Sequence, residues 1–104
     1  MSHTVRYHLE LGGEVVARID ADEYDFPWTY GRLVDSPVFE RFRRYFTDDT
    51  DWPDDDPELE ALCGEVQDKG RFVLRDTASG VAYQGVCLNH DGGGVVWFRH
   101  GDPA

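Results

Sequence analysis

Apolar and polar residues alternate along two runs near the start of the chain, and a glycine pair separates the runs. Apolar side chains occupy every second position from Val5 to Leu11 and again from Val15 to Ile19. This period of two puts them on one face of a strand, so the runs predict a β-hairpin. A three-residue loop, Gly12 to Glu14, keeps apolar positions opposite one another, whereas a two-residue loop would place a charge among them. The expected pairs are Leu11 with Val15, Leu9 with Ala17, and Tyr7 with Ile19.

The segment from Tyr24 to Leu33 carries four aromatic side chains in a strict period of two. In an extended backbone the four rings share one face. Pro27 cannot donate a ladder hydrogen bond, which places the segment at a sheet edge or in an ordered extended loop. With four acidic neighbours, the rings form either the lid of the hydrophobic core or a docking surface, and their regular spacing favours the core. The rings are Tyr24, Phe26, Trp28 and Tyr30, and the acids are Asp20, Asp22, Glu23 and Asp25.

Two later segments change to a spacing of three and four residues, which is typical of amphipathic helices. The first helix is expected to begin after a cap at Ser36 and to run to about residue 47, with Val38, Phe39, Phe42, Tyr45 and Phe46 on its apolar side. The second begins at Pro57 after a cap at Asp56 and ends at Lys69 and Gly70. Its interior glycine, Gly64, suggests close packing against a neighbouring element.

Three strands are expected in the last third of the chain, over residues 71–76, 81–88 and 95–100, with turn sequences between them. The predicted order is therefore ββ-αα-βββ. Residues 1–104 are expected to form one α+β domain with an antiparallel sheet of about five strands and two helices packed on one face. Trp97, which shares its strand parity with Val95, is expected in the core.

The chain carries a net charge of −11, from 21 acidic and 10 basic residues. This field repels phosphate backbones, so neither nucleic acid nor an anionic membrane surface is expected as a partner, whereas a basic protein is attracted. The alternative is that the acidic surface serves only solubility, as in a salt-adapted or high-GC source. Taken by itself, the net charge favours this alternative. Because no signal-peptide pattern and no apolar run of about 20 residues is visible, the cytoplasm is expected. Cys63 and Cys87 are predicted to be buried free thiols.

The most enzyme-like sequence is Asn89-His90-Asp91, followed by three glycines. It suggests a base with its carboxylate, or two metal ligands joined by His100, but it is also an ordinary turn sequence, and the turn is favoured. The glycines lead into a strand, whereas a dinucleotide site needs a helix N-terminus. The acidic run from Asp48 to Glu60 lacks the glycine of a calcium-binding loop, and Pro53 lies within it. No cofactor, metal site or catalytic residue is therefore predicted.

The remaining candidates are for binding. Trp52, among acids and prolines, either packs back as an anchor or stays exposed for a partner. Arg41 and Arg44 either grip a carboxylate or phosphate, or pair with the acids of the following linker, and pairing is favoured. The candidate partner- or ligand-binding residues are Tyr24, Phe26, Trp28, Tyr30, Arg41, Arg44, Trp52, Asp54, Asp55 and Asp56.

The segment Asp25-Phe26-Pro27-Trp28, with Gly31 and then Ser36-Pro37-Val38-Phe39 opening a helix, resembles a set of small bacterial proteins that form a domain of unknown function. Those proteins are similar in their opening hairpin, their aromatic-proline segment before a helix, and a closing strand pair with a tryptophan, here Trp97. The resemblance implies a bacterial, cytoplasmic protein and brings no activity, cofactor or catalytic residue.

Three functional hypotheses follow. The leading one is a non-enzymatic protein-binding module, such as an immunity- or inhibitor-like partner of a basic protein. The alternative is a small-molecule-binding or weakly enzymatic domain that uses the aromatic face of residues 24–30 with Arg41, Arg44 or His90. The third is a housekeeping domain whose acidic surface has no specific partner.

Overall fold

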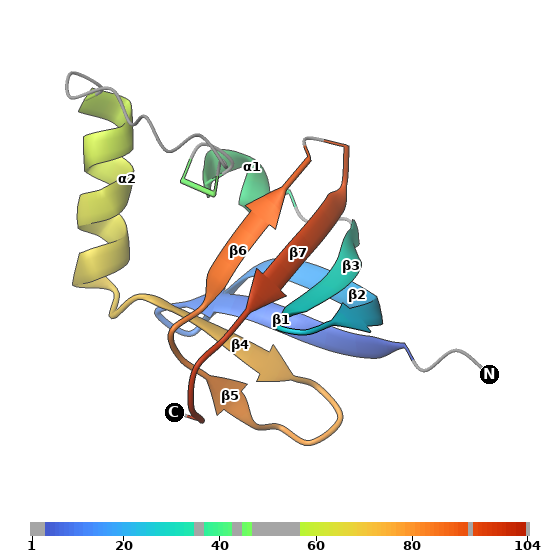
Figure 1. Ribbon diagram of the computed structural model, residues 1–104. Coiled ribbons are helices and arrows are strands. Elements are labelled where there is room, and N and C mark those ends of the chain that lie inside the picture. Colours follow the sequence, from blue (N-terminus) through green and yellow to red (C-terminus); the bar gives the residue numbers. More distant parts are fainter. Residues whose placement is uncertain (1–3, 35–36, 43–44, 47–56, 92, 104) are drawn as a thin grey trace.

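In the computed structural model the chain is an α+β fold with an antiparallel sheet and two helices, as predicted (Figure 1). The structure describes residues 4–34, 37–42, 45–46, 57–91 and 93–103. These residues form seven strands, so the expectation of about five strands in the order ββ-αα-βββ is wrong. In chain order the elements are β1 (Val5–Leu11), β2 (Glu14–Asp25), β3 (Trp28–Val34), α1 (Phe39–Phe42), α2 (Pro57–Asp68), β4 (Phe72–Asp76), β5 (Ala82–Tyr83), β6 (Cys87–His90) and β7 (Val95–Arg99).

The strands form one sheet in the order β5-β4-β1-β2-β3-β7-β6, and all neighbouring strands are antiparallel. Two local features explain the additional strands. The aromatic segment supplies β3, because Phe26 and Pro27 turn the chain between β2 and β3. The predicted strand over residues 81–88 is divided into β5 and β6 around Gly85, whose φ of +68° is readily adopted by glycine.

The first hairpin has the predicted pairs at its centre, Leu9 with Ala17 and Tyr7 with Ile19. Its loop differs from the prediction, because Leu11 pairs with Glu14 across a two-residue turn of Gly12 and Gly13. Both glycines have positive φ, as such tight turns require. A bulge between Leu9 and Glu10 then absorbs one residue of β2 and restores the apolar register.

The sheet curls strongly, so its inner face encloses the core. Tyr7 of β1 and Phe98 of β7 are separated by two intervening strands, yet their rings meet edge to face with centroids 5.4 Å apart. A bridge between Tyr83 and Pro103 brings the chain after β7 next to β5, and Figure 1 shows this C-terminal end beside β5. The curled sheet therefore resembles a barrel, and it has two ends.

Aromatic side chains from α1 and its flanking turn close one of these ends. Phe39 and Phe42 are fully buried, and Phe46 packs beside Phe39 and Phe72. Phe42 also meets the Phe72 ring edge to face, at the start of β4. From α2, Val66 joins this core. The buried core comprises Leu9, Leu11, Val16, Ala17, Ile19, Ala21, Phe39, Phe42, Phe46, Val66, Phe72, Leu74, Leu88, Val96 and Phe98.

Three predictions about the helices and the core need correction. The α1 helix spans four residues, and residues 45–46, which were expected inside it, lie in a turn. Among the described residues, no atom lies within 4 Å of the position that a β-carbon on Gly64 would occupy, so the expected close packing at this glycine is not found there. Trp97 is not in the core, because Val96 and Phe98 fill the inner face and Trp97 lies on the opposite face of β7, partly exposed.

Helix α2 begins and ends next to the residues that predicted its ends. It begins at Pro57, which is suited to the first helical position. It ends before Gly70, whose φ is +87°, and the Arg71 N–H donates to the Val66 carbonyl at 2.8 Å, as in a glycine-terminated helix. The predicted caps, Ser36 and Asp56, lie outside the described residues.

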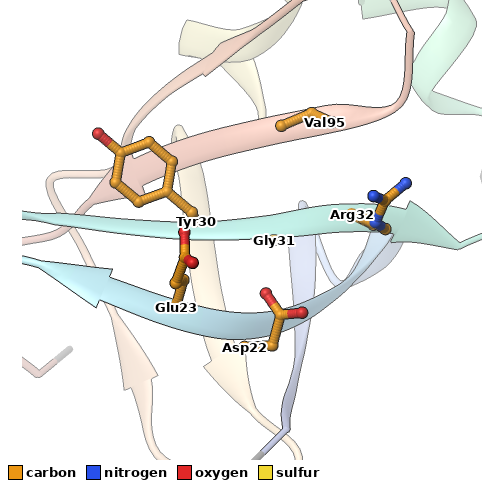
Figure 2. Close-up of a pocket in the computed structure, with 6 residues that line it drawn as sticks. All are labelled: Asp22, Glu23, Tyr30, Gly31, Arg32 and Val95. Carbon is orange, nitrogen blue, oxygen red and sulfur yellow. The ribbon is translucent and has the colours of Figure 1, made fainter.

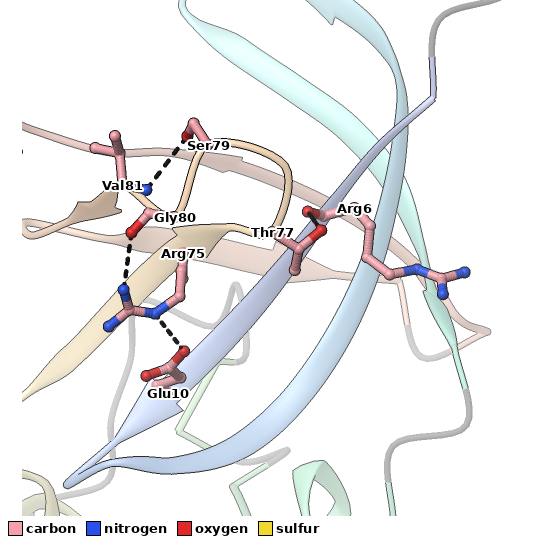
Figure 3. Close-up of polar contacts among 7 residues, drawn as sticks. All are labelled: Arg6, Glu10, Arg75, Thr77, Ser79, Gly80 and Val81. Atoms are coloured by element: carbon pink, nitrogen blue, oxygen red, sulfur yellow. Dashed lines mark hydrogen bonds and ion pairs between the residues drawn. The ribbon is translucent and has the colours of Figure 1, made fainter.

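Polar side chains cover the outer face of the sheet over β1 and β4 (Figure 3). Arg75 donates to the Glu10 carboxylate at 2.8 Å and to the Gly80 carbonyl at 2.8 Å. The Thr77 hydroxyl donates to the Arg6 carbonyl at 2.9 Å. These contacts hold the β4–β5 turn against β1, so this part of the outer face is used for structure.

Candidate functional site

A hollow of about 290 Å³ lies at the end of the curled sheet opposite α1. It forms where β1 begins, β2 ends, β3 begins and β7 ends, because antiparallel neighbours bring those ends together. We call it the mouth hollow. Its lining residues are Val5, Tyr7, Ala21, Asp22, Glu23, Tyr24, Thr29 and His100.

A bulge in β2 shapes this site. The pairing between β2 and β3 passes from Ala21–Gly31 to Glu23–Tyr30, so Asp22 is the extra residue. Consecutive residues of a regular strand point to opposite faces, but a bulge re-aims its side chains. Both residues border the mouth hollow, but Glu23 pairs with Tyr30 and so shares the outer face of the sheet with it.

The same two acids also border a second hollow, of about 230 Å³, on the other side of the bulge. It is lined by Asp22, Glu23, Tyr30, Gly31, Arg32 and Val95. Figure 2 shows the Asp22 and Glu23 carboxylates directed toward β3, with the Glu23 carboxylate near Tyr30. Arg32 lies at the other end of this hollow. The second hollow therefore holds both signs of charge.

The walls of the mouth hollow are aromatic and held in place. Tyr7 packs against the core residue Phe98, and burial, together with the nearby Asp76 and Tyr83, raises the pKa of the Tyr7 hydroxyl. His100 stacks on Tyr83 with ring centroids 4.0 Å apart, and its Nδ1 lies 3.0 Å from the Gly101 carbonyl oxygen. These contacts hold the Tyr7 and His100 rings in place in the wall of the mouth hollow.

The tip of the β2–β3 hairpin projects the aromatic segment beside the mouth hollow. Tyr24 is 67% exposed and Phe26 is 81% exposed, so interpreting these rings as core or core lid is wrong. The four rings also do not share one strand, because β2 ends at Asp25 and β3 begins at Trp28. Trp28 and Tyr30 are partly exposed, and the Arg99 guanidinium lies 5.3 Å from the Trp28 ring centroid.

Of the two arginine candidates, Arg41 does not join this site. Arg41 of α1 donates to the Glu65 carboxylate of α2 at 2.8 Å, and its guanidinium lies over the Phe42 ring. It was expected to pair with the linker that follows α1, but this partner comes from α2. The other predicted binding residues, Arg44, Trp52, Asp54, Asp55 and Asp56, lie outside the described residues.

The favoured turn interpretation is wrong for Asn89 and His90, which lie in β6 and pair with Trp97 and Val96, whereas Asp91 follows the strand. The Asp91 carboxylate accepts the backbone N–H groups of Gly93 at 2.7 Å and Val95 at 3.2 Å, which lowers the pKa of Asp91. The His90 ring meets Phe39 of α1 edge to face. Among the residues that the structure describes, no three His, Cys, Asp or Glu side chains are grouped to hold a metal. Cys63 is partly buried and Cys87 is exposed, so both were wrongly expected to be buried.

The sequence signalled only part of the site. Tyr24 and the neighbouring acids Asp22 and Glu23 were identified as one edge, but Tyr7, Thr29 and His100 were not. These three come from β1, from β3 and from the residue after β7. No local pattern links them, because the curl of the sheet brings them together.

No family model, curated protein or solved structure matches the chain. The resemblance to small bacterial proteins therefore stays a prediction. No helix in the described part of the chain is long and apolar enough to cross a membrane.

Proposed function

We propose that this protein is a non-enzymatic protein-binding module whose β2–β3 hairpin tip docks a basic partner protein. The observation that carries the proposal is the exposure of Phe26, 81%, at the end of a paired hairpin. A ring this exposed contributes little to the core, whereas aromatic side chains supply much of the binding energy at protein interfaces. Core packing therefore does not explain an aromatic ring at this position.

Charge supports a basic partner. Asp22, Glu23 and Asp25 flank the exposed rings of Tyr24 and Phe26, and all five side chains are exposed. The whole chain carries a net charge of −11. Such a field speeds encounter with a positively charged surface, and the rings then supply apolar contact at the centre of an acidic rim.

The small-molecule alternative receives less support. It joined the aromatic segment to Arg41, Arg44 or His90. Arg41 pairs with Glu65, and the His90 ring lies against Phe39 at the α1 end of the sheet. Neither residue lines the mouth hollow or the second hollow. The two described polar groups that this hypothesis names, Arg41 and His90, therefore lie away from both hollows.

The proposal is tested by capture of partners from a lysate of the source cells at low salt, followed by mass spectrometry. The test variant is Tyr24→Ser/Phe26→Ser. The matched control is Val81→Ser, because Val81 is also an exposed large apolar residue but lies elsewhere, just before β5. We expect a basic protein to be retained by the wild type and the control and lost by the hairpin variant, with urea unfolding showing that each variant folds.

Retention should also fall as salt rises, because screening weakens attraction between exposed charges. Equal retention by the hairpin variant would contradict the proposed docking surface. Retention of no basic protein by the wild type would contradict the protein-binding function itself.

A further inference from the structure

Three aromatic side chains share the outer face of the sheet over β3 and β7. Trp28 and Tyr30 are two residues apart in β3, and Tyr30 pairs with Trp97 of β7, so the three rings lie on the face opposite the core. All three are partly exposed. The helices contribute Phe39 and Val66 to the core inside the curl, on the other side of the sheet. We call Trp28, Tyr30 and Trp97 the outer platform.

The outer platform differs from the outer face over β1 and β4. That face carries ion pairs, Arg6 with Asp20 and Arg75 with Glu10. Polar cover of this kind is usual where one face of an antiparallel sheet meets water. Aromatic rings gathered on such a face, with charged residues around them, are typical of an interaction site.

The polar groups among these rings are mainly hydrogen-bond donors. The indole N–H groups of Trp28 and Trp97 can only donate, as can the Arg99 guanidinium, which lies 5.3 Å from the Trp28 ring centroid. Asn89, which pairs with Trp97, adds an amide N–H group. A proline-rich segment has the complementary chemistry, because its carbonyl groups are exposed in the polyproline II conformation and its prolines have no N–H. Its apolar rings can lie flat on tryptophan and tyrosine, as in other domains that bind such segments.

The spacing of the two tryptophans also suits this conformation. Trp97 pairs with Tyr30, so Trp28 and Trp97 are diagonal neighbours on adjacent strands. Diagonal neighbours are about 7 to 8 Å apart at the backbone, and large side chains reach beyond that distance. In polyproline II every third residue returns to the same side after about 9 Å. Prolines one turn apart can therefore contact Trp28 and Trp97 together.

The charge along one border of the outer platform fits a basic partner. Glu23 pairs with Tyr30 and Asp25 pairs with Trp28, so two exposed acids of β2 lie beside the rings of β3. With a net charge of −11, the protein attracts lysine or arginine residues that flank the prolines. Phe26 lies at the tip of the same two strands, so one partner can contact both places.

We propose that the outer platform binds a proline-rich segment of the basic partner in the polyproline II conformation, with prolines on the Trp28 and Trp97 rings. This inference rests on the proposed function, since it takes the segment from the protein that docks on the hairpin tip. It adds a second contact surface, distinct from Phe26, and names the kind of segment that this surface selects.

The first test uses capped decaproline as a probe, with a capped glycine-serine peptide of equal length as its flexible control. Both are titrated into the full-length protein labelled with fluorotryptophan, and the signals of Trp28 and Trp97, assigned by replacing each with phenylalanine, are followed by fluorine NMR. We expect saturable shifts of both signals with decaproline and none with the control peptide. No shift with decaproline, or equal shifts with both peptides, would overturn the assignment. Cellohexaose is titrated as well, because rings also stack on sugars, and a response to cellohexaose alone would assign the outer platform to a carbohydrate instead.

The second test compares one substitution on the two faces of the β2–β3 hairpin. Tyr30 lies in the outer platform, whereas Tyr24 pairs with Thr29 and lines the mouth hollow with it, on the inner side of the sheet. Tyr30→Ser should weaken decaproline binding about tenfold, as the loss of a central interface ring does. Tyr24→Ser should weaken it far less, and equal weakening would contradict binding at the outer platform. Urea unfolding shows whether each variant folds, and the fluorine signals of the wild type decide the proposal if Tyr30→Ser does not.

Competition during partner capture gives the third test. Excess decaproline should release the captured basic protein, and the glycine-serine peptide should not, because only decaproline occupies the outer platform. If decaproline does not bind while Phe26 still controls capture, the outer-platform proposal is wrong and the hairpin proposal stands. If decaproline binds but releases no partner, the partner does not supply the segment and the inference is overturned. Capture that depends on Tyr30 but not on Phe26 would contradict the hairpin proposal alone.

Discussion

Gly31 of β3 lies so close to the Asp20 carbonyl of β2 that a β-carbon at Gly31 would sit 2.5 Å from that oxygen and 2.9 Å from the Ala21 Cα. Both neighbours are backbone atoms and cannot rotate away. Gly31 also pairs with Ala21 immediately before the Asp22 bulge, so the close approach belongs to the backbone that forms both hollows.

We therefore expect Gly31→Ala to lower the free energy of unfolding by about 1 to 3 kcal/mol, the usual cost of forcing extra volume into a packed site. Urea unfolding followed by tryptophan fluorescence measures this change. Unchanged stability would mean that the two strands can separate at Gly31 at little cost.

Substitution of Gly64 by alanine should have the opposite effect on stability from Gly31→Ala. Gly64 is exposed inside α2, and a methyl group added there would have no atom of the described residues within 4 Å. Alanine restricts the unfolded chain more than glycine does and favours the helix, so Gly64→Ala should raise the free energy of unfolding by about 0.5 to 1 kcal/mol. The same urea titration tests it, and a loss of stability would indicate a packing role for this glycine.

Local signals predicted the parts of the fold that depend on neighbouring residues. The pairs Leu9–Ala17 and Tyr7–Ile19 follow from alternation, and α2 begins at the proline and ends before the glycine that indicated it. The strand β7 shows where such signals fail. Its residues Val95 to Phe98 are all apolar, so alternation could not tell that Val96 and Phe98 face the core while Trp97 lies on the other face.

The candidate site was harder to predict because it depends on bulges and curvature. Asp22 and Glu23 look like ordinary strand neighbours in the sequence, and only the bulge lets both border the second hollow. Phe26 was assigned to an extended stripe because its spacing fits a strand, but the Phe26–Pro27 turn moves it to a hairpin tip. Each error arose where the backbone departs from the regular geometry that pattern analysis assumes.

Phe26 and Phe39 should respond very differently to the same substitution. Phe39 is completely buried and packs against Phe46 and His90, so Phe39→Ala should cost about 3 to 5 kcal/mol of stability. Phe26 is exposed, so Phe26→Ala should change stability by less than about 0.5 kcal/mol. Thermal and urea unfolding of the two variants compare them directly. A large loss for Phe26→Ala would give this ring a structural role and weaken the case for docking.

The ion pair between Arg41 and Glu65 links α1 to α2. Both side chains are partly in solvent, so their coupling energy in a double-mutant cycle of Arg41→Ala and Glu65→Ala should be about 0.2 to 1 kcal/mol and should fall at high salt. Lys69 is also within 4.0 Å of Glu65, and the cycle keeps its contribution separate only if Lys69 is unchanged in all four proteins. Zero coupling at low salt would show that the helices are held by their apolar contacts alone.

The raised pKa of Tyr7 predicts that the folded protein loses stability at alkaline pH. Burial, Asp76 and Tyr83 raise its pKa in the folded protein above the ordinary value near 10. As the pH passes about 10, the unfolded chain therefore releases the Tyr7 proton first, which favours unfolding. The contribution of the neutral ring to stability is complete below that pH and is lost progressively as the pH rises toward the folded-state pKa.

Tyr7→Phe removes this proton while keeping the ring that packs on Phe98. We expect the free energy of unfolding of Tyr7→Phe to fall less steeply than that of the wild type between about pH 9 and about pH 11. Burial also raises the pKa of Tyr45, so some alkaline loss should remain in Tyr7→Phe and be reduced further by adding Tyr45→Phe. Urea titrations at several pH values measure the slopes, and identical slopes for the wild type and Tyr7→Phe would show that Tyr7 ionises equally in the folded and unfolded chains.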